Sequence, residues 1–195
     1  MRRCAWLAAW GLLLALAATP AAWAGQYEQS LARATAGLKK RDPAAVLGGL
    51  RGAIAAAWTK LPFTVLEARL VASPPSGFGR YAPRRGNVFG PNEPMFLYLE
   101  PVGFKVRYDP GSQTYYYNLA ADFNLIDAWG RVISGRRNFS RFSGTSRHFP
   151  DQIMLSFTYK MRGLPPGSYR LETVLRDTLG KRSHTVVTPV VIKGE

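Results

Sequence analysis

The strongest constraint on the fold is a two-residue period of apolar side chains that runs through most of the chain after Phe63. Its clearest example covers residues 153–161, where Ile, Leu, Phe, Tyr and Met alternate with mostly polar residues. Successive side chains of a β-strand point to opposite faces, so this period predicts strands buried on one face. Similar segments lie near residues 66–70, 95–99, 115–125, 131–134, 169–175 and 183–192. The pattern predicts a mostly β fold, a β-sandwich or barrel of about seven strands over residues 62–195.

Residues 25–61 carry a helical period instead. Apolar residues of the first part recur on one helix face at Tyr27, Leu31, Ala34 and Leu38. Asp42-Pro43 follows, and Asp before Pro is typical of an N-cap and the first helical residue. A short helical pair is therefore predicted to precede the sandwich.

The second of these helices has large apolar residues along one stripe, at Val46, Leu47, Leu50, Ile54, Trp58 and Leu61. Its only charges are Arg51 and Lys60. Such a stripe has to be covered, and packing within the chain is the favoured interpretation. A membrane surface and a second copy of the chain are the alternatives.

Residues 1–24 have the pattern of a secretory signal peptide. Arg2 and Arg3 precede an almost wholly apolar run at residues 5–18, and Ala22-Trp23-Ala24 is a small-x-small cleavage pattern. A membrane anchor is the alternative, but the apolar run is shorter than the roughly 20 residues that span a bilayer. We expect cleavage before Gly25, export to the periplasm, and no transmembrane helix afterwards.

The charge of the chain is strongly positive. It has 26 Lys and Arg against 12 Asp and Glu, and loss of Arg2 and Arg3 leaves a formal +12. Such a charge favours contact with anionic surfaces such as lipid headgroups or acidic polysaccharides. Basic residues scattered for solubility are an equally weighted explanation.

Two predicted hairpins share an Asp-x-x-Gly turn followed by a basic residue, Asp127–Gly130 and Asp177–Gly180. Aspartate at the first turn position accepts backbone N–H bonds, and glycine at the fourth tolerates a positive φ. Both aspartates are therefore interpreted as turn formers rather than as catalytic carboxylates.

Tyr169 stands two residues after Gly167, between a Pro-Pro-Gly turn and an alternating strand. This spacing resembles the fibronectin type III and related immunoglobulin-like domains, over roughly residues 63–193. The resemblance implies that Tyr169 is a tyrosine corner, with its ring packed inward and its hydroxyl bonded to the preceding loop. The chain departs from antibody domains, because it lacks their cysteine pair and Trp129 falls in a turn.

A second resemblance rests on residues 92–103. The residues that carry it are Asn92-Glu93-Pro94, Tyr98, Glu100, Pro101 and Gly103. The stretch is similar to one in uncharacterised exported bacterial proteins that also have a signal peptide, a short helical segment and a Gly/Pro/Arg-rich loop. This likeness implies an envelope location and an immunoglobulin-like fold, and it implies no particular activity.

Two segments are candidate binding regions. Residues 73–94 form a long connection in which aromatic residues and arginines alternate, and long ordered loops are often functional. Its candidates, with two on the neighbouring strand, are Tyr81, Arg84, Arg85, Phe89, Tyr98 and Glu100. The alternative is a structural loop whose aromatic side chains are pinned to the body of the domain.

The second segment, residues 130–149, has no acidic residue and contains four candidate arginines, Arg136, Arg137, Arg141 and Arg147. Guanidinium groups bind phosphate or carboxylate bidentately, so the segment is a candidate for an anionic ligand. A solvated edge strand protected by its charges is the slightly favoured alternative.

The sequence contains no recognisable catalytic constellation. It lacks a Gly-x-Ser-x-Gly motif, and its two histidines, His148 and His184, have no ligand-spaced partners. We therefore expect a non-enzymatic binding module without metal or cofactor. Its partner is expected to be a protein or an anionic envelope component. Nucleic acid is not expected, because no nucleic-acid-binding motif is present.

Overall fold

The computed structural model describes residues 21–194, so the apolar run of the predicted signal peptide lies outside the described residues. Two helices come first, α1 (Ala21–Lys40) and α2 (Pro43–Trp58). Asp42 caps α2 as predicted, since its Oδ1 accepts hydrogen bonds from the backbone N–H groups of Ala44 and Ala45. The chain forms two compact units that divide within α2, one ending at Ala53 and the other beginning at Ile54.

The strands that follow are β1 (Thr64–Val71), β2 (Val88–Phe89), β3 (Met95–Val102), β4 (Arg107–Asp109), β5 (Thr114–Ile126), β6 (Val132–Ser146), β7 (Leu155–Tyr159), β8 (Gly167–Asp177) and β9 (Arg182–Ile192). The mostly β fold with a preceding helical pair is confirmed. The predicted count of about seven is exceeded by β2 and β4. These two strands have only two and three residues, which is too short for alternation to show.

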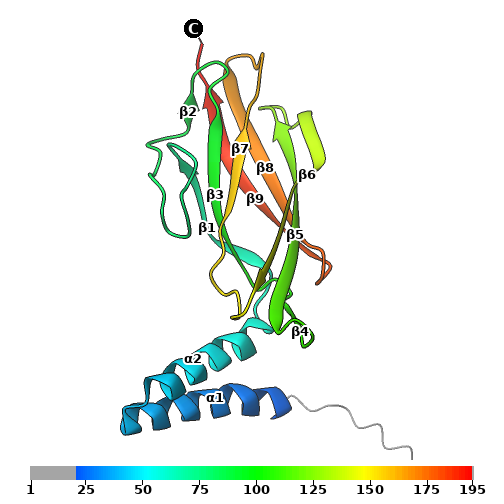
Figure 1. Cartoon of the computed structure of the whole chain (residues 1–195). Coiled ribbons are helices and arrows are strands. Elements are labelled where there is room, and N and C mark those ends of the chain that lie inside the picture. Colours follow the sequence, from blue (N-terminus) through cyan, green and yellow to red (C-terminus); the bar gives the residue numbers. More distant parts are fainter. Residues whose placement is uncertain (1–20, 195) are drawn as a thin grey trace, which may run out of the picture. The chain divides into compact units, whose positions relative to one another are not determined.

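The strands form two sheets, drawn as two layers in Figure 1. The smaller has the order β1-β3-β7, and the larger has the order β2-β9-β8-β5-β4, with β6 also paired to β5. All pairs are antiparallel except β2 with β9. Pairs such as Leu119 with Asp177 and Leu125 with Leu171 fix the register of the two central strands.

The alternating apolar residues of both sheets meet in one hydrophobic core. Leu97, Leu99 and Phe157 from the smaller sheet join Leu125 and Leu171 from the larger one, and all are buried. One polar pair lies inside this core, because the Tyr159 hydroxyl is 2.7 Å from Oγ1 of Thr173. Burial raises the pKa of Tyr159, so the pair stays neutral.

The predicted burial of the large apolar stripe on α2 is wrong for most of its members. Leu47, Leu50 and Ile54 are exposed. The two helices instead pack through small residues: a Cβ on Gly49 would lie 2.5 Å from the backbone nitrogen of Ala34. Among residues 21–194, neither helix combines the length and apolar composition that crossing a bilayer requires.

Candidate functional site

The aromatic side chains of the 73–94 segment are built into the fold. The rings of Tyr81 and Tyr98 lie with their centres 4.3 Å apart, and Tyr98 is fully buried. The Tyr98 hydroxyl donates to Oε1 of Glu100 at 2.5 Å and accepts the backbone N–H of Gly79 at 2.8 Å. Burial, and then the hydrogen bond to Glu100, raise the pKa of Tyr98 to about 12.

Arg84, in the middle of the segment, has a similar structural role. Its guanidinium lies 4.1 Å from the ring centre of the buried Phe89, pairs with Glu93 at 2.7 Å, and donates to the Val88 carbonyl at 2.8 Å. Of the arginines predicted here, Arg85 is left exposed. The segment therefore offers fewer free side chains than its sequence suggests.

Several residues of the Asn92–Gly103 stretch are also explained by contacts within the chain. Asn92 has a positive φ of 58°, and its side-chain oxygen accepts the Gly163 backbone N–H at 3.3 Å. The Gly90 backbone N–H bonds to Glu93 at 2.7 Å. Gly103 has φ 69°, and a Cβ there would overlap the carbonyl oxygen of Pro62. These contacts give Asn92, Glu93 and Gly103 structural roles within the chain.

The 130–149 segment consists mainly of β6, which is much longer than the predicted strand at 131–134. Within the described residues β6 pairs only with β5, so it is an edge strand. Arg136, Arg137, Arg141 and Arg147 are all exposed. Arg136 is opposite Phe123 and Arg141 is opposite Ala120. Successive residues of β5 point to opposite faces, and Phe123 is three residues after Ala120, so these two residues lie on opposite faces. Directly paired residues share a face, so Arg136 and Arg141 also lie on opposite faces of the sheet.

A bulge separates them and is centred on Asn138, which has φ 51°. Its backbone N–H donates to Oδ1 of Asp122 at 2.7 Å, and its side-chain oxygen accepts from Arg176 at 2.6 Å. Arg176 also binds Asp122 through two nitrogens, at 2.9 and 3.0 Å. Burial alone would raise the pKa of Asp122, but these hydrogen bonds and the charges of Arg176 and Arg137 lower it.

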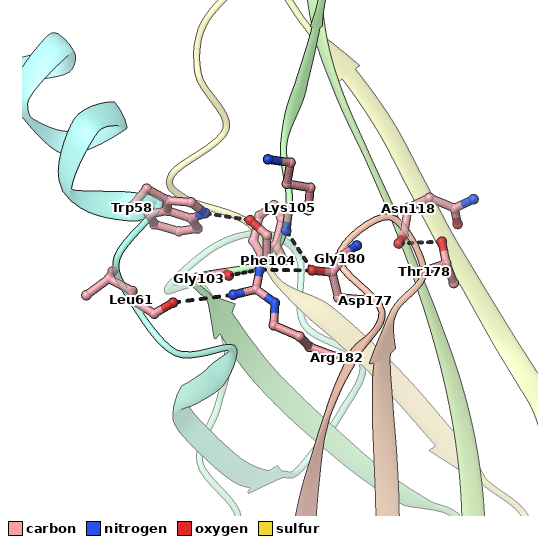
Figure 2. A network of polar contacts seen from close by, with 10 residues as sticks. All are labelled: Trp58, Leu61, Gly103, Phe104, Lys105, Asn118, Asp177, Thr178, Gly180 and Arg182. Atoms are coloured by element: carbon pink, nitrogen blue, oxygen red, sulfur yellow. Dashed lines mark hydrogen bonds and ion pairs between the residues drawn. The ribbon is translucent and has the colours of Figure 1, made fainter. Parts of the chain in front are cut away.

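The Asp177–Gly180 turn joins β8 to β9 and anchors neighbouring segments, as Figure 2 shows. The buried Asp177 accepts the N–H groups of Lys105 and Gly180, and its Oδ2 lies 3.1 Å from Nη2 of Arg182. Arg182 also donates to the Gly103 carbonyl at 2.6 Å. Gly180 does not have the predicted positive φ; Lys181 has it instead, at 54°. Gly180 is required because a Cβ would overlap the Asp177 carboxylate.

Trp58, at the end of α2, lies close to this network. Its indole N–H donates to the Phe104 carbonyl at 2.8 Å, and its ring makes edge contacts with Phe104 and Phe149. The Thr178 backbone and hydroxyl both donate to the Asn118 carbonyl. This end of the sandwich is thus held by satisfied internal contacts.

The Asp127–Gly130 turn follows the last residue of β5, so it lies at the other end of the larger sheet from the Asp177–Gly180 turn. Asp127 accepts the backbone N–H groups of Trp129 and Arg131 at 3.0 and 2.9 Å, and pairs with the Arg131 side chain at 2.8 Å. Burial opposes ionisation of Asp127, but these donors outweigh it and lower its pKa. Gly130 has the predicted positive φ, 85°. The turn is therefore tightly ordered and carries Trp129 at its tip.

Trp129 is 79% exposed, an unusual state for the largest apolar side chain. The guanidinium carbon of Arg131 lies 5.1 Å from its ring centre, within the range of a cation–π contact. The indole borders a surface groove of about 710 Å³, here called the Trp129 groove. Its lining residues are 127–129, 131, 133–134 and 160–169.

The far wall of the Trp129 groove is the connection between β7 and β8. Tyr169 closes this wall: its ring is buried and its hydroxyl donates to the Pro165 carbonyl at 2.7 Å. This is the hydrogen bond that a tyrosine corner makes. Gly167 lies beneath the Tyr169 ring.

The lining of the Trp129 groove is basic. It contains Arg131, Lys160 and Arg162, and its single carboxylate, Asp127, is already paired with Arg131. Lys160 and Arg162 are exposed and have no ion pair among the described residues. Ile133, Met161 and Leu164 supply apolar surface between these charges.

Sequence reasoning placed Asp127 and Gly130 in a turn but did not select Trp129, Lys160 or Arg162. The available indication was a tryptophan inside a turn with an arginine two residues later, since a turn has little surface to bury an indole. The predicted arginines of β6 do not gather at this groove.

Comparisons with known proteins found no matching family model and no curated protein similar to this chain. Within residues 21–194, no group of three or more His, Cys, Asp and Glu side chains is placed to hold a metal ion.

Proposed function

We propose that the chain is an exported, non-enzymatic binding module of the bacterial periplasm that recognises an acidic saccharide of the envelope in the Trp129 groove. The observation that carries this proposal is the combination of an exposed indole with three cations and one already paired carboxylate. Export is supported by the signal-peptide pattern of residues 1–24.

The immunoglobulin-like assignment is part of the proposal. It is supported by two packed antiparallel layers and by the hydrogen bond from Tyr169 to Pro165 at the start of β8, the penultimate strand. Domains of this architecture carry binding surfaces on the loops at their ends, and the Trp129 groove lies at such an end. The predicted division into a signal peptide, a helical segment and a sandwich is proposed with it.

The chemistry of the groove favours a ligand with both a flat apolar face and a negative charge. An exposed indole offers a stacking surface, whereas Lys160 and Arg162 offer charge-assisted hydrogen bonds to carboxylate or phosphate. A sugar ring that bears a carboxylate or phosphate presents both features on one unit. The strongly positive chain would also increase the rate of encounter with such a polymer.

The proposal is tested by titrating residues 25–195 with an oligogalacturonate and with a neutral oligosaccharide of equal length. We expect binding of the acidic probe that weakens with salt, and a loss of about tenfold or more on Trp129→Ala. Lys160→Gln with Arg162→Gln should weaken binding similarly, whereas the control Arg141→Gln with Arg147→Gln should not. Equal binding of the neutral probe, or no effect of Trp129→Ala, would contradict the proposal.

A protein partner is the second candidate, and an apolar hollow favours it. This hollow has a volume of about 670 Å³ and is lined by residues that include Leu66, Phe78, Glu100 and Ile153. Leu66 lies in a bulge of the edge strand β1 and is exposed, as is Phe78 of the 73–94 segment. Photo-crosslinking in cells from residue 78 should capture a specific protein, and this capture should be lost on Leu66→Ser. Capture that Leu66→Ser leaves intact would reject this candidate.

A further inference from the structure

The helical pair has an unusual distribution of side chains. In most amphipathic helices the large apolar residues are buried and the small or polar ones face solvent. Here the small residues lie between the helices, whereas Leu38 of α1 and Leu47 and Leu50 of α2 are 66%, 51% and 45% exposed. The exposed leucines therefore need a separate explanation.

The residues in contact between α1 and α2 determine on which side of the helical pair each exposed residue lies. Ser30 faces Gly52, Ala34 faces Gly49, and Gly37 faces Val46, so the helices run antiparallel. Figure 1 shows them side by side. Residues of a helix are spaced by about 100°, so this contact places Leu38 and Leu50 on one side of the pair. Arg33 lies on the other side, where its guanidinium is beside Gly48. Tyr27, also exposed, lies on the Leu38 side.

Cations flank this apolar side. Lys39 directly follows Leu38, and Arg51 directly follows Leu50, so each charge is displaced by about 100° around its helix from a leucine. Over residues 25–53 there are five basic residues, Arg33, Lys39, Lys40, Arg41 and Arg51, against the two acidic residues Glu28 and Asp42. The excess is three positive charges, and Asp42 is used as the α2 cap.

We infer that the helical pair binds the surface of an anionic lipid bilayer. Tyr27, Leu38, Leu47 and Leu50 would enter the boundary between headgroups and acyl chains, and Lys39 and Arg51 would contact lipid phosphates. A helix with one apolar side and flanking Lys or Arg lies in the plane of the interface. The stems of Lys and Arg can remain in the apolar layer while their charges reach the headgroups.

The small-residue contact suits this location. Packing of Gly49 on Ala34 and of Gly52 on Ser30 keeps the helices close without using their leucines. Helix pairs that keep apolar side chains for lipid use the same arrangement. Because α2 has 16 residues, it is about 24 Å long, which suits a helix lying in the interface.

Flotation with vesicles tests this inference. The protein is residues 25–195, because the apolar run at residues 5–18 would itself bind lipid. The vesicles contain either phosphatidylcholine alone or a mixture with phosphatidylglycerol. We expect preferential binding to the mixed vesicles and a decrease at high salt. No binding to the mixed vesicles, or equal binding to both kinds that salt leaves unchanged, would overturn the inference.

Variants locate the contact. Leu38→Gln, Leu47→Gln and Leu50→Gln combined should reduce partitioning about tenfold or more, and Gln preserves helix propensity. Lys39→Gln with Arg51→Gln should also reduce it about tenfold. The apolar control is Val88→Gln with Val187→Gln, two exposed positions on the sandwich, and the charge control is Arg141→Gln with Arg147→Gln. Both controls should bind as the parent protein does.

Two outcomes would place the contact elsewhere and overturn the inference. Loss of binding in the β6 charge control but not in Lys39→Gln with Arg51→Gln would assign the lipid contact to the sandwich. A dimer in light scattering that the leucine variant converts to a monomer, with no vesicle binding by the parent protein, would show that a second copy covers the leucines. Circular dichroism of each variant confirms that the helices are retained.

Discussion

The guanidinium of Arg131 lies over the indole of Trp129 at 5.1 Å and at the same time pairs with Asp127 at 2.8 Å. One arginine thus neutralises the carboxylate that shapes the turn and contacts the exposed aromatic ring at its tip. As a consequence, the charges of Lys160 and Arg162 in the Trp129 groove are not offset by Asp127. The turn that organises the hairpin therefore also prepares the groove for an anion.

The hydrogen bond from Tyr169 to the Pro165 carbonyl should contribute measurably to stability. Tyr169→Phe removes the hydrogen bond to Pro165 and leaves a part-buried carbonyl without its partner. We expect a decrease of about 1–1.5 kcal/mol in the free energy of unfolding, measured by urea denaturation. Tyr108→Phe is the control, since Tyr108 is exposed and makes no hydroxyl hydrogen bond among the described residues. Equal stabilities of the two variants would contradict this role.

Gly103 should be much less tolerant of a side chain than Gly79, although the two have nearly the same φ, 69° and 65°. At Gly79 a Cβ would meet nothing within 4 Å, so Gly79→Ala should cost only the backbone strain, about 1 kcal/mol. At Gly103 the Cβ would overlap the Pro62 carbonyl, so Gly103→Ala should cost about 3 kcal/mol or more. Thermal unfolding of both variants separates the cost of backbone strain from the cost of the overlap. Similar losses of stability in the two variants would argue against the close contact with Pro62.

The adjacent glycines of α2 should respond in opposite directions. Gly48→Ala adds a methyl group in ordinary contact with Arg33 and should stabilise the helix by about 0.5–1 kcal/mol. Gly49→Ala places the methyl group against the Ala34 backbone and should destabilise the pair by about 1–3 kcal/mol. The measurement is the melting of the helical circular dichroism signal. A stabilising Gly49→Ala would show that the helices do not pack through this residue.

The ion pair of Asp122 with Arg176 should make stability depend on pH in the acidic range. Because the pKa of Asp122 is lowered in the folded chain, its contribution is complete above its unfolded pKa of about 3.9. This contribution is lost as the pH falls through the folded value. At neutral pH, Asp122→Asn should cost about 1–2 kcal/mol, and the difference from the parent protein should shrink on acidification.

Glu172→Gln is the matched control for this variant, since Glu172 is on the neighbouring strand and has no ion pair among the described residues. It should leave the acidic limb of the stability curve unchanged. A constant difference between Asp122→Asn and the parent protein at every pH would contradict the assignment.

The sequence predicts the strands that alternate cleanly, because burial on one face imposes the two-residue period. It also predicts the Asp127 turn, since the geometry of a turn is set by neighbours in the chain. The hydrogen bond of Tyr169 was predicted through the resemblance to immunoglobulin-like domains. The length of β6 was missed because the Asn138 bulge interrupts its alternation. Gly144 lies within β6 because the Tyr117 ring occupies the space of a Cβ there.

The candidate site was less predictable. Periodicity locates an apolar stripe on α2 but does not say which face of α2 contacts α1. In the structure the contacting face is the one with small residues, where Gly49 packs on Ala34. The sequence leaves open whether the arginines of β6 form one patch, and only the register shows that Arg136 and Arg141 lie on opposite faces. The Trp129 groove joins residues 127–134 to residues 160–169, and only the fold brings these segments together.

The most direct test of the central claim uses the two tryptophans of residues 25–195. Trp58 is buried and hydrogen-bonded, whereas Trp129 is exposed at the groove. Acrylamide quenching of the fluorescence should therefore report mainly on Trp129, and Trp129→Phe should remove most of it. We predict that an oligogalacturonate protects Trp129 from acrylamide and that a neutral oligosaccharide does not. Binding of the acidic probe with unchanged quenching of Trp129 would contradict the account.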